Sequence, residues 1–355
     1  MVITGATGNV GTALLAALEP GHDVVGLARR LPDTTVEPYR RAGWRAVDVG
    51  LPGAEEKLAE VFAGADAVVH LAWAISPMRG DPPMWRTNDH GTRNVLAAAA
   101  AAGVSHVVAA SSVAAYGPAP RWEKVTEDWP CDGIAGSAYS RGKAALETLL
   151  DRFEEKYPQV EVARIRPCAI LHREAAGEFA RWLLGPAVPA HLVGGRRLPV
   201  PLWTDLRAQI VHTTDVAEAI RLILDTGFTG AVNLAAPEVL DADALAGVLG
   251  GTRVPVPKPV VQLATRAAWL GGVLPVHPGW LELADRAALA DTTLAETALG
   301  WQPRYDAAAA LADLVAGFRS GAGAASPPLA PPRRDGVLAR LRSLTRVGPS
   351  HQSQA

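Results

Sequence analysis

The chain has 355 residues, of which 49% are hydrophobic, so it can bury a large core in one α/β domain or in two domains sharing an interface. A formal net charge of -2 excludes a global field that attracts nucleic acid or anionic membranes, so we expect a small-molecule partner and no nucleic-acid partner. Only Cys131 and Cys168 are present, which excludes a disulfide framework and fits a reducing cytoplasm.

Short β-branched segments alternate with alanine- and leucine-rich segments through the first half of the chain, the pattern of βαβ units. Strands are predicted at Val2–Thr4, Asp23–Ala28, Arg45–Val47, Ala67–Leu71, His106–Ala110 and Glu161–Ile165. Helices are predicted between them at Asn9–Leu18, Glu55–Phe62, Trp85–Ala102 and Ala138–Lys156. The fold class is therefore α/β, with a Rossmann-type doubly wound parallel sheet over residues 1–170.

The regular alternation stops between residues 171 and 208, where prolines and glycines predict loops and short elements. It returns over residues 209–236, with a strand at Gln209–His212, a helix at Thr214–Leu224 and a strand at Ala231–Leu234. We expect this stretch to rejoin the first domain. Residues 171–208 and 237–320 are then predicted to form a smaller, mainly helical C-terminal cap that binds the substrate.

The end of the chain, residues 321–355, begins with GAGAASPPLAPPRR, the composition of an unfolded linker. From Arg333 onward five arginines and one aspartate give a local formal charge of 5 - 1 = +4, so a disordered basic tail is predicted. An amphipathic stretch around Val337–Leu344 leaves open a contact with a membrane surface or a protein.

No segment is long enough to span a membrane. The longest apolar run, Val95–Val104, has about half of the roughly 20 residues needed. The N-terminus has no basic segment followed by an apolar stretch, so we expect a cytoplasmic protein. A homodimer stays open at this level.

A glycine turn follows the first predicted strand, in the sequence Thr4-Gly5-Ala6-Thr7-Gly8-Asn9-Val10-Gly11. Gly5 suits a tight turn, Gly8 allows close approach of a pyrophosphate, and Gly11 allows the helix to pack on the strand. Free N–H groups at the start of the helix then face the phosphates. The turn predicts a dinucleotide cofactor, with contacts from Gly5, Thr7, Gly8, Asn9, Val10 and Gly11.

The end of the second predicted strand bears on the choice of cofactor. A carboxylate there accepts from the ribose 2'-hydroxyl of NAD, whereas arginine accommodates the 2'-phosphate of NADP. The sequence has Arg29 and Arg30 at this point and no local carboxylate. We therefore prefer NADP over NAD, and the alternative is that both arginines are solvated surface groups.

Tyr139 and Lys143 are four residues apart in a predicted helix, so their side chains share one face. A nearby ammonium favours the phenolate, and lowering the tyrosine pKa by about 3 units requires roughly 4 kcal/mol. Ser111 and Ser112 end the fifth predicted strand, at the edge where such folds bind ligands. No such grouping indicates a metal site, because His172, His191 and His212 lack metal-ligand spacing.

The motifs together resemble the extended short-chain dehydrogenase/reductase family, the NAD(P)-dependent epimerase/dehydratase group. The resemblance covers nearly the whole chain except the tail. It rests on TGATGNVG (4–11), VDV (47–49), HLAWA (70–74), NDHGTRNVL (88–96), SSVAAYG (111–117), YSRGK (139–143), VHTTDVAEA (211–219) and LGWQP (299–303).

The resemblance implies roles for individual residues. Ser112 matches the catalytic serine or threonine, Tyr139 the acid/base, and Lys143 the lysine that binds the nicotinamide ribose and lowers the tyrosine pKa. It also implies that Asn88 supports the active site and that His212 and Asp215 support the fold. The remaining implied cofactor contacts are Asp48 and Val49 beside the adenine, Leu71, Ala72 and Trp73 along the cleft, and Pro167.

Two departures from the family pattern bear on the substrate. Where members acting on nucleotide sugars carry an LRPxNxYG-like pattern, this chain has Ala169 and Leu171-His172, which disfavours a nucleotide sugar. Where 4,6-dehydratases place an Asp-Glu pair, it has Val113-Ala114, which disfavours dehydration. In the cap, candidate anion-binding or stacking residues are Arg173, Arg181, Arg196, Arg197, Arg207, Trp182 and Trp203.

The sequence thus predicts an oxidoreductase or epimerase-type enzyme that transfers a hydride between nicotinamide and a secondary alcohol or ketone carbon. One alternative is an NADPH-dependent ketone or aldehyde reductase. A second, from a different class, is a non-catalytic protein that senses the dinucleotide and recruits a partner.

Overall fold

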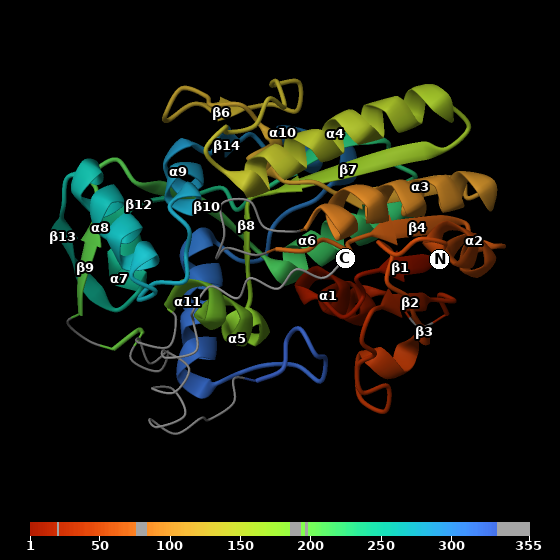
Figure 1. Ribbon diagram of the computed structural model, residues 1–355, viewed down its shortest axis with the longest axis horizontal. Coiled ribbons are helices and arrows are strands. Elements are labelled where there is room, and N and C mark those ends of the chain that lie inside the picture. The colour runs from red at the N-terminus through yellow and green to blue at the C-terminus, as the bar shows by residue number, and fades with distance from the viewer. Residues whose placement is uncertain (20, 76–83, 185–192, 196–197, 332–355) are drawn as a thin grey trace.

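The computed structural model describes residues 1–19, 21–75, 84–184, 193–195 and 198–331. Its central feature is a parallel seven-stranded sheet with helices on both faces (Figure 1). The strand order is β11-β7-β5-β4-β1-β2-β3. From β1 the chain adds β2 and β3 on one side and then β4, β5, β7 and β11 on the other, so the order of connection switches between β1 and β4, beside the glycine turn. The strands are β1 Val2–Thr4, β2 Val25–Ala28, β3 Gly43–Ala46, β4 Ala67–His70, β5 His106–Ala110, β7 Glu161–Pro167 and β11 Gly230–Leu234.

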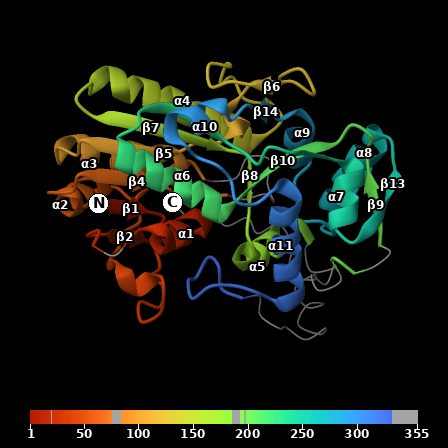
Figure 2. The same ribbon diagram turned by 180° about the vertical axis from the view of Figure 1, so that it is seen from behind.

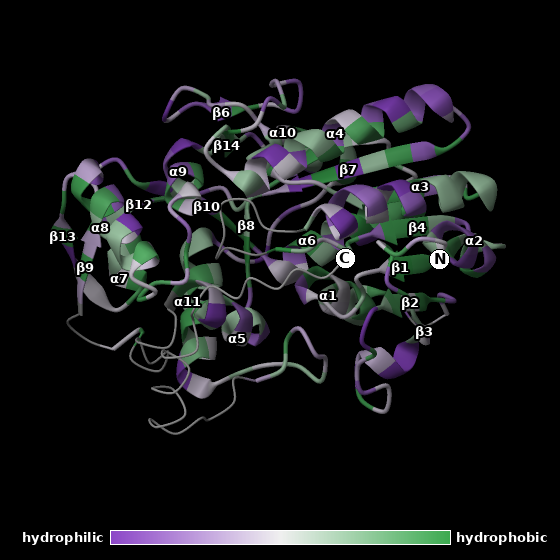
Figure 3. Cartoon of the chain, viewed as in Figure 1, coloured by the Kyte–Doolittle hydropathy of each residue, from purple (hydrophilic) through white to green (hydrophobic). Residues whose placement is uncertain are grey.

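Two apolar layers hold the helices against this sheet. On one side, Leu14 of α1 (Asn9–Ala17) and Ile220 of α6 (Thr213–Thr226) pack on the strands (Figure 2). The opposite layer contains side chains of α2 (Ala54–Phe62), α3 (Gly91–Ala101) and α4 (Ala138–Lys156). The strands β1, β2 and β4 are buried and almost continuously apolar, as their green colour in Figure 3 shows, whereas the edge strand β3 is largely exposed.

The six predicted strands and the seventh at the return of the chain are confirmed, with shifted ends. The strand β10 (Arg207–His212) is different from the prediction, because it does not join the central sheet. It pairs with β8 (Ala169–Leu171) and β12 (Val239–Asp241) in a separate three-stranded sheet. The chain reaches β8 directly after β7, so the separate sheet continues from the edge where the site lies. The predicted helix over residues 85–102 begins with a wide π turn, η2 (Arg86–His90).

The remaining elements are short turns and strands within the first 170 residues and the mainly helical C-terminal region. Besides helices, this part contains parallel pairs between β9 (Leu198–Leu202) and β13 (Gly251–Pro255) and between β6 (Lys124–Val125) and β14 (Leu289–Ala290). The short turns are η1 Tyr39–Arg41, η3 Val113–Ala115, η4 Arg173–Ala175 and η5 Ala180–Leu184. The helices are α5 Ala176–Phe179, α7 Ala242–Val248, α8 Lys258–Leu270, α9 Gly279–Arg286, α10 Thr293–Leu299 and α11 Ala307–Ser320.

Residues 321–331 contradict the prediction of an unfolded linker. Leu329 and Ser326 are buried, and the Ser326 hydroxyl donates to the Thr7 carbonyl at 2.9 Å. The Asp33 amide donates to the Ala325 carbonyl at 2.9 Å. The glycine and proline content sets the local turns, and one buried leucine supplies an apolar anchor. The remainder of the predicted tail, residues 332–355, lies outside the described residues.

Among the described residues, no helix is both long enough and apolar enough to cross a membrane.

Candidate active site and dinucleotide cleft

The glycine turn packs so closely on its neighbours that side chains are excluded at two positions. Gly5 has a φ of 69°, and a Cβ there would lie 2.7 Å from the Ala72 amide nitrogen. A Cβ on Gly11 would lie 2.6 Å from the Gly5 carbonyl oxygen. Only glycine permits this turn, which brings the start of α1 against the loop that follows β4.

The start of α1 has no side-chain cap, and its N-cap residue Gly8 has extended backbone. The first N–H groups of the helix therefore keep their capacity to bind an anion, helped by the helix dipole. Asn9 is held by α6, which is distant in sequence, because the Thr213 hydroxyl donates to Asn9 Oδ1 at 3.0 Å. Val10 is half-buried beside it and packs on the core.

The loop after β4 is fixed by Asn88 and Thr4. Asn88 makes two reciprocal hydrogen bonds with the backbone of Ala74, at 2.7 and 2.9 Å. The Thr4 hydroxyl accepts from the Ala72 amide at 3.3 Å, and the Leu71 amide donates to the Thr4 carbonyl. This brings Leu71, Ala72 and Trp73 alongside the glycine turn, where the sequence places the cofactor cleft.

Residues predicted near the adenine ribose lie at the ends of neighbouring strands. Arg29 and Arg30 directly follow β2 and are exposed, and neither has a hydrogen bond or ion pair within the described part of the chain. Asp48 is engaged, since its Oδ2 accepts from Arg86 Nη2 at 2.9 Å. Val49 is buried, and its carbonyl accepts from Asn94.

Ser112, Tyr139 and Lys143 come together at the carboxyl end of β5. The start of α4 is tied to the turn after Ser112, because the Ser140 hydroxyl donates to the Ala114 carbonyl at 2.6 Å. The Ser112 side chain lies beside that of Tyr139 and favours its ionised form. Lys143 Nζ donates to the Ala110 carbonyl at 2.8 Å, and the Ser112 hydroxyl donates to the Pro167 carbonyl at 3.2 Å.

Burial dominates the electrostatics of these groups. It raises the pKa of Tyr139 above its usual value, and the neighbouring Ser112 side chain opposes that rise. Burial lowers the pKa of Lys143 to about 7, against an opposing effect of Glu147. The sequence analysis predicts a lowered pKa for Tyr139, whereas the pKa in this structure is raised. Lowering it requires more positive charge beside the phenol than the protein groups around it supply.

Trp73 contributes an observation that the sequence alone does not give. Its indole Nε1 is buried without a hydrogen-bond partner among the described residues, and the Lys143 ammonium lies 3.6 Å from its ring centroid. The unpartnered donor of Trp73 is one residue from Ala72, which packs on the glycine turn at the uncapped start of α1. These features fit a nicotinamide dinucleotide, which offers phosphates to the helix and polar oxygens to buried donors.

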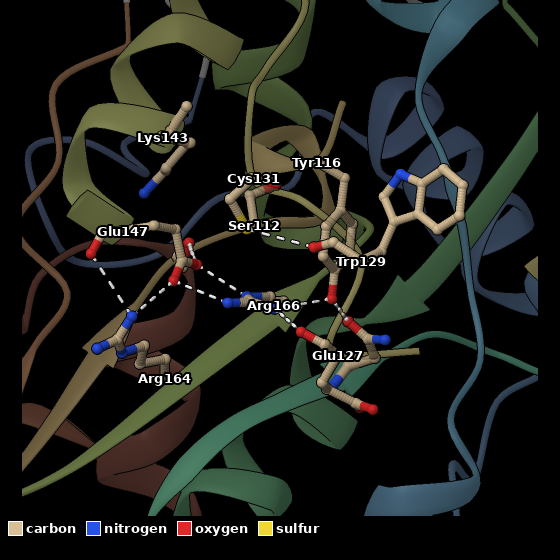
Figure 4. A network of polar contacts seen from close by, with 12 residues as sticks. Ser112, Tyr116, Glu127, Trp129, Cys131, Lys143, Glu147, Arg164 and Arg166 are labelled. Carbon is tan, nitrogen blue, oxygen red and sulfur yellow. Dashed lines mark hydrogen bonds and ion pairs between the residues drawn. The ribbon is translucent and has the colours of Figure 1, made fainter. Parts of the chain in front are cut away.

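A buried ionic network lies beneath the reactive residues (Figure 4). Glu147, one helical turn after Lys143, accepts from Arg166 at 2.8 and 2.9 Å and from Arg164 at 3.1 Å. Arg166 lies between Glu147 and Tyr116, and donates to the Tyr116 hydroxyl at 3.0 Å. The Ser111 hydroxyl also donates to Glu147. Ser111 is therefore bonded to Glu147, and Ser112 is the serine that lies beside Tyr139.

The cap reaches the site through α9. Trp280 packs against Tyr139 with ring centroids 5.2 Å apart, and Leu283 of the same helix packs on Ala114 and Ile134. Sequence reasoning missed Trp280 and Glu147. A tryptophan in an irregular region and a glutamate on a helix carry no spacing signal, and their positions follow only from the tertiary fold.

The cap candidates named from the sequence mostly have structural partners. Trp203 is buried and donates to Asp285 at 3.0 Å, and Arg207 donates to the carbonyls of Asp285 and Ala287. Arg181 donates to the Pro328 carbonyl, Arg173 pairs with Asp313, and Trp182 packs on Phe179. His191, Arg196 and Arg197 lie outside the described residues.

Two family-like motifs meet at the junction between sheet and cap. Asp215 of α6 accepts from the backbone amides of Arg304 and Tyr305, at 3.1 and 3.2 Å. Trp301 is fully buried and donates to the Asp215 carbonyl at 2.8 Å. These contacts hold the turn before α11 against α6.

Comparisons with known proteins agree with this geometry. The chain is 30% identical to an uncharacterised protein of Mycobacterium tuberculosis over 98% of its own length, and it spans 33% of that relative. Against an L-arabinose 1-dehydrogenase (NAD(P)(+)) of Haloferax volcanii it is 36% identical, over 32% of this chain and 40% of the relative. The chain thus spans about a third of the length of the Mycobacterium relative.

A solved structure shares the fold. The dTDP-glucose 4,6-dehydratase DesIV of Streptomyces venezuelae, with NAD and TYD bound, superposes with a TM-score of 0.68 at 22% identity. The similarity covers 90% of this chain and 96% of DesIV. The family model for the NAD dependent epimerase/dehydratase family matches residues 1–235, and the chain belongs to that family.

Proposed function

We propose that this chain is an NAD(P)-dependent oxidoreductase or epimerase that acts on a secondary alcohol or ketone carbon of a small molecule. The observation that carries the proposal is the convergence of Ser112, Tyr139 and Lys143 at the end of β5. Lys143 lies against Trp73, which follows the loop residues Leu71 and Ala72 that pack on the glycine turn.

Each group has a distinct task in the proposed reaction. The Tyr139 hydroxyl exchanges a proton with the substrate oxygen, and Ser112 hydrogen-bonds to the same oxygen. The Lys143 ammonium, in its charged form, favours the phenolate and holds a ribose hydroxyl. The bound dinucleotide supplies the hydride chemistry. Burial of Tyr139 and its cover by Trp280 keep bulk water from the proton transfer.

We further propose NADP as the preferred cofactor. Arg29 and Arg30 are exposed directly after β2, and a guanidinium binds a phosphate better than it binds a hydroxyl. Titration of nicotinamide fluorescence gives dissociation constants for NADPH and NADH. NADPH is expected to bind at least about tenfold tighter, and the double variant Arg29→Ala, Arg30→Ala to lose that difference, about 1.4 kcal/mol or more. Equal or tighter NADH binding would sink the preference.

The same site can support net reduction or epimerisation, and these differ in what happens to the cofactor. An epimerase retains its cofactor through the cycle, whereas a reductase exchanges it. Cofactor released on denaturation of the purified protein supports epimerisation, and ketone-dependent consumption of NADPH supports reduction. If the protein neither retains a cofactor nor consumes one with any alcohol or carbonyl tested, the proposal of a redox enzyme fails.

The substrate is proposed to be sugar-like or another small molecule, with dehydration disfavoured. Val113 and Ala114 occupy the turn after Ser112 and are buried, so this turn offers no carboxyl group for eliminating water. Ala169 and His172 differ from the nucleotide-sugar pattern at the end of β7. We therefore place sugars without a nucleotide and simple ketones first in a substrate screen.

A further inference from the structure

Three side chains that are distant in sequence meet where β8 and β10 end beside α11. His172 follows β8, His212 ends β10 and Asp313 lies in α11. One potential ligand atom from each lies within 4.8 Å of the others. The strands β8 and β10 are parallel neighbours with Leu171 opposite His212, so the two histidines leave the same strand ends.

The three groups already contact one another. His212 Nε2 is 3.3 Å from Asp313 Oδ2. The rings of His172 and His212 pack edge to face, with centroids 5.3 Å apart. Tyr305 stacks on the other side of His212, at 3.9 Å. Packing therefore restricts the His212 ring and leaves its Nε2 directed at the carboxylate.

In metal sites, hydrogen bonds from surrounding groups orient the side chains that bind the ion. The side chains of this cluster have such partners. His212 Nδ1 accepts from the Thr214 amide at 3.3 Å and lies 2.7 Å from the Thr214 hydroxyl, so Nε2 carries the ring proton towards Asp313, and a bound ion would replace that proton. The Arg173 amide donates to Asp313 Oδ2 at 2.8 Å. The Arg173 guanidinium, half exposed and 3.4 Å from Asp313 Oδ1, is the cation that a bound ion would displace.

The donor set of the cluster also suits a cation. It holds two imidazoles and one carboxylate, from His172, His212 and Asp313. A neutral imidazole is the form that binds a metal. Two imidazole nitrogens and one carboxylate are the donors of zinc-type ions, whereas Mg²⁺ and Ca²⁺ prefer sites made of oxygen.

We propose that His172, His212 and Asp313 bind a divalent transition metal ion of the zinc type, with water completing its coordination. The ion ties β8, β10 and α11 together at one point. The next residue, Thr213, donates to Asn9 at the start of α1, and α11 leads into residues 321–331, which contact Thr7. A bound ion therefore braces the elements around the dinucleotide turn. This site is separate from the proposed reaction and does not depend on it.

The test uses the full chain, stripped of metal with a chelator and then titrated with Zn²⁺. Metal content is measured by mass spectrometry, affinity by competition with an indicator, and coordination by the visible spectrum of the Co²⁺-loaded protein. The variants are His172→Ala and Asp313→Asn. His22→Ala is the matched control, because His22 is exposed in a loop before β2.

We expect one Zn²⁺ per chain in the wild type and in His22→Ala, with Co²⁺ bands typical of mixed nitrogen and oxygen ligands. His172→Ala and Asp313→Asn are each expected to weaken Zn²⁺ binding by about 100-fold or more. Zn²⁺ should also raise the thermal midpoint of the wild type and not that of the variants. Asp313→Asn retains an acceptor for the Arg173 amide, so it decides the question if His172→Ala does not fold. Zn²⁺ affinity that is unchanged in Asp313→Asn, or a wild type that binds no Zn²⁺, overturns the proposal.

Discussion

At the scale of single residues, the site places the buried ammonium of Lys143 next to the half-buried phenol of Tyr139. Lys143 is almost fully buried, and its contacts are the Ala110 carbonyl and the face of Trp73. These partners offset only part of the cost of removing the charge from water, so the pKa of Lys143 falls to about 7. Positions kept for catalysis at a cost in stability are common in enzymes.

Replacing this lysine should therefore stabilise the protein. The pKa of Lys143 is about 7 in the folded chain and 10.5 for the usual group, so the unfolded chain binds more protons between these values. The folding cost is fully present below pH 7 and fades as the pH rises towards 10.5. Lys143→Met should raise the thermal midpoint at pH 6 by about 1–3 °C and abolish turnover. Melting curves at several pH values check this, and an equal or larger gain at pH 10 would refute it.

At the scale of elements, α4, β5 and β7 are joined by the Glu147 network. Although burial opposes it, hydrogen bonding and ion pairing with Arg166 lower the pKa of Glu147, so the carboxylate is charged. Two arginines lie against this one group, and Arg164 has further partners in Asp151 and Glu154. The network fixes the helix that carries Tyr139 and Lys143 relative to the strand ends.

Glu147→Ala should cost about 3–5 kcal/mol in the free energy of unfolding, because it leaves the charge of Arg166 buried without its carboxylate. Urea unfolding measures the loss. Glu155→Ala is the matched control, since Glu155 is exposed on the same helix and its removal should change stability by about 0.5 kcal/mol or less. Similar values for the two variants would show that the network does not hold α4.

A second element-scale prediction concerns residues 321–331. Leu329 is 1% exposed, so Leu329→Ala should destabilise the chain by about 2–4 kcal/mol. Leu263→Ala in α8 is the control, because Leu263 is 70% exposed, and we expect a change of about 0.5 kcal/mol or less. Chemical denaturation compares them. If Leu329→Ala is as stable as the control, this segment contributes no packing energy to the fold.

At the scale of the whole molecule, sequence predicts what repeats along the chain and misses what depends on distant contacts. The alternation of short β-branched segments with helical segments predicts the parallel sheet, and the order of Ser112, Tyr139 and Lys143 predicts the reactive group. The sequence predicts a strand at Gln209–His212 but does not specify its pairing partner, and β10 lies in a separate sheet.

The candidate site shows the same division. Gly5 and Gly11 were predicted because their backbone geometry requires glycine, whatever the rest of the fold. Trp280 and Ser326 reach the site or the turn from far along the chain, and no local pattern marks them. Their roles follow from the packing of the cap and of residues 321–331.

The central claim is that Tyr139 exchanges a proton with the substrate in a nicotinamide-dependent reaction. The most direct measurement is the turnover of Tyr139→Phe against wild type, with cofactor affinity measured on the same preparations and Tyr157→Phe on the same helix as the control. We predict that Tyr139→Phe lowers turnover by about 10²-fold or more. Its dissociation constant for the cofactor should stay within about twofold of wild type, and the control should keep wild-type turnover. Full turnover by Tyr139→Phe would contradict the account.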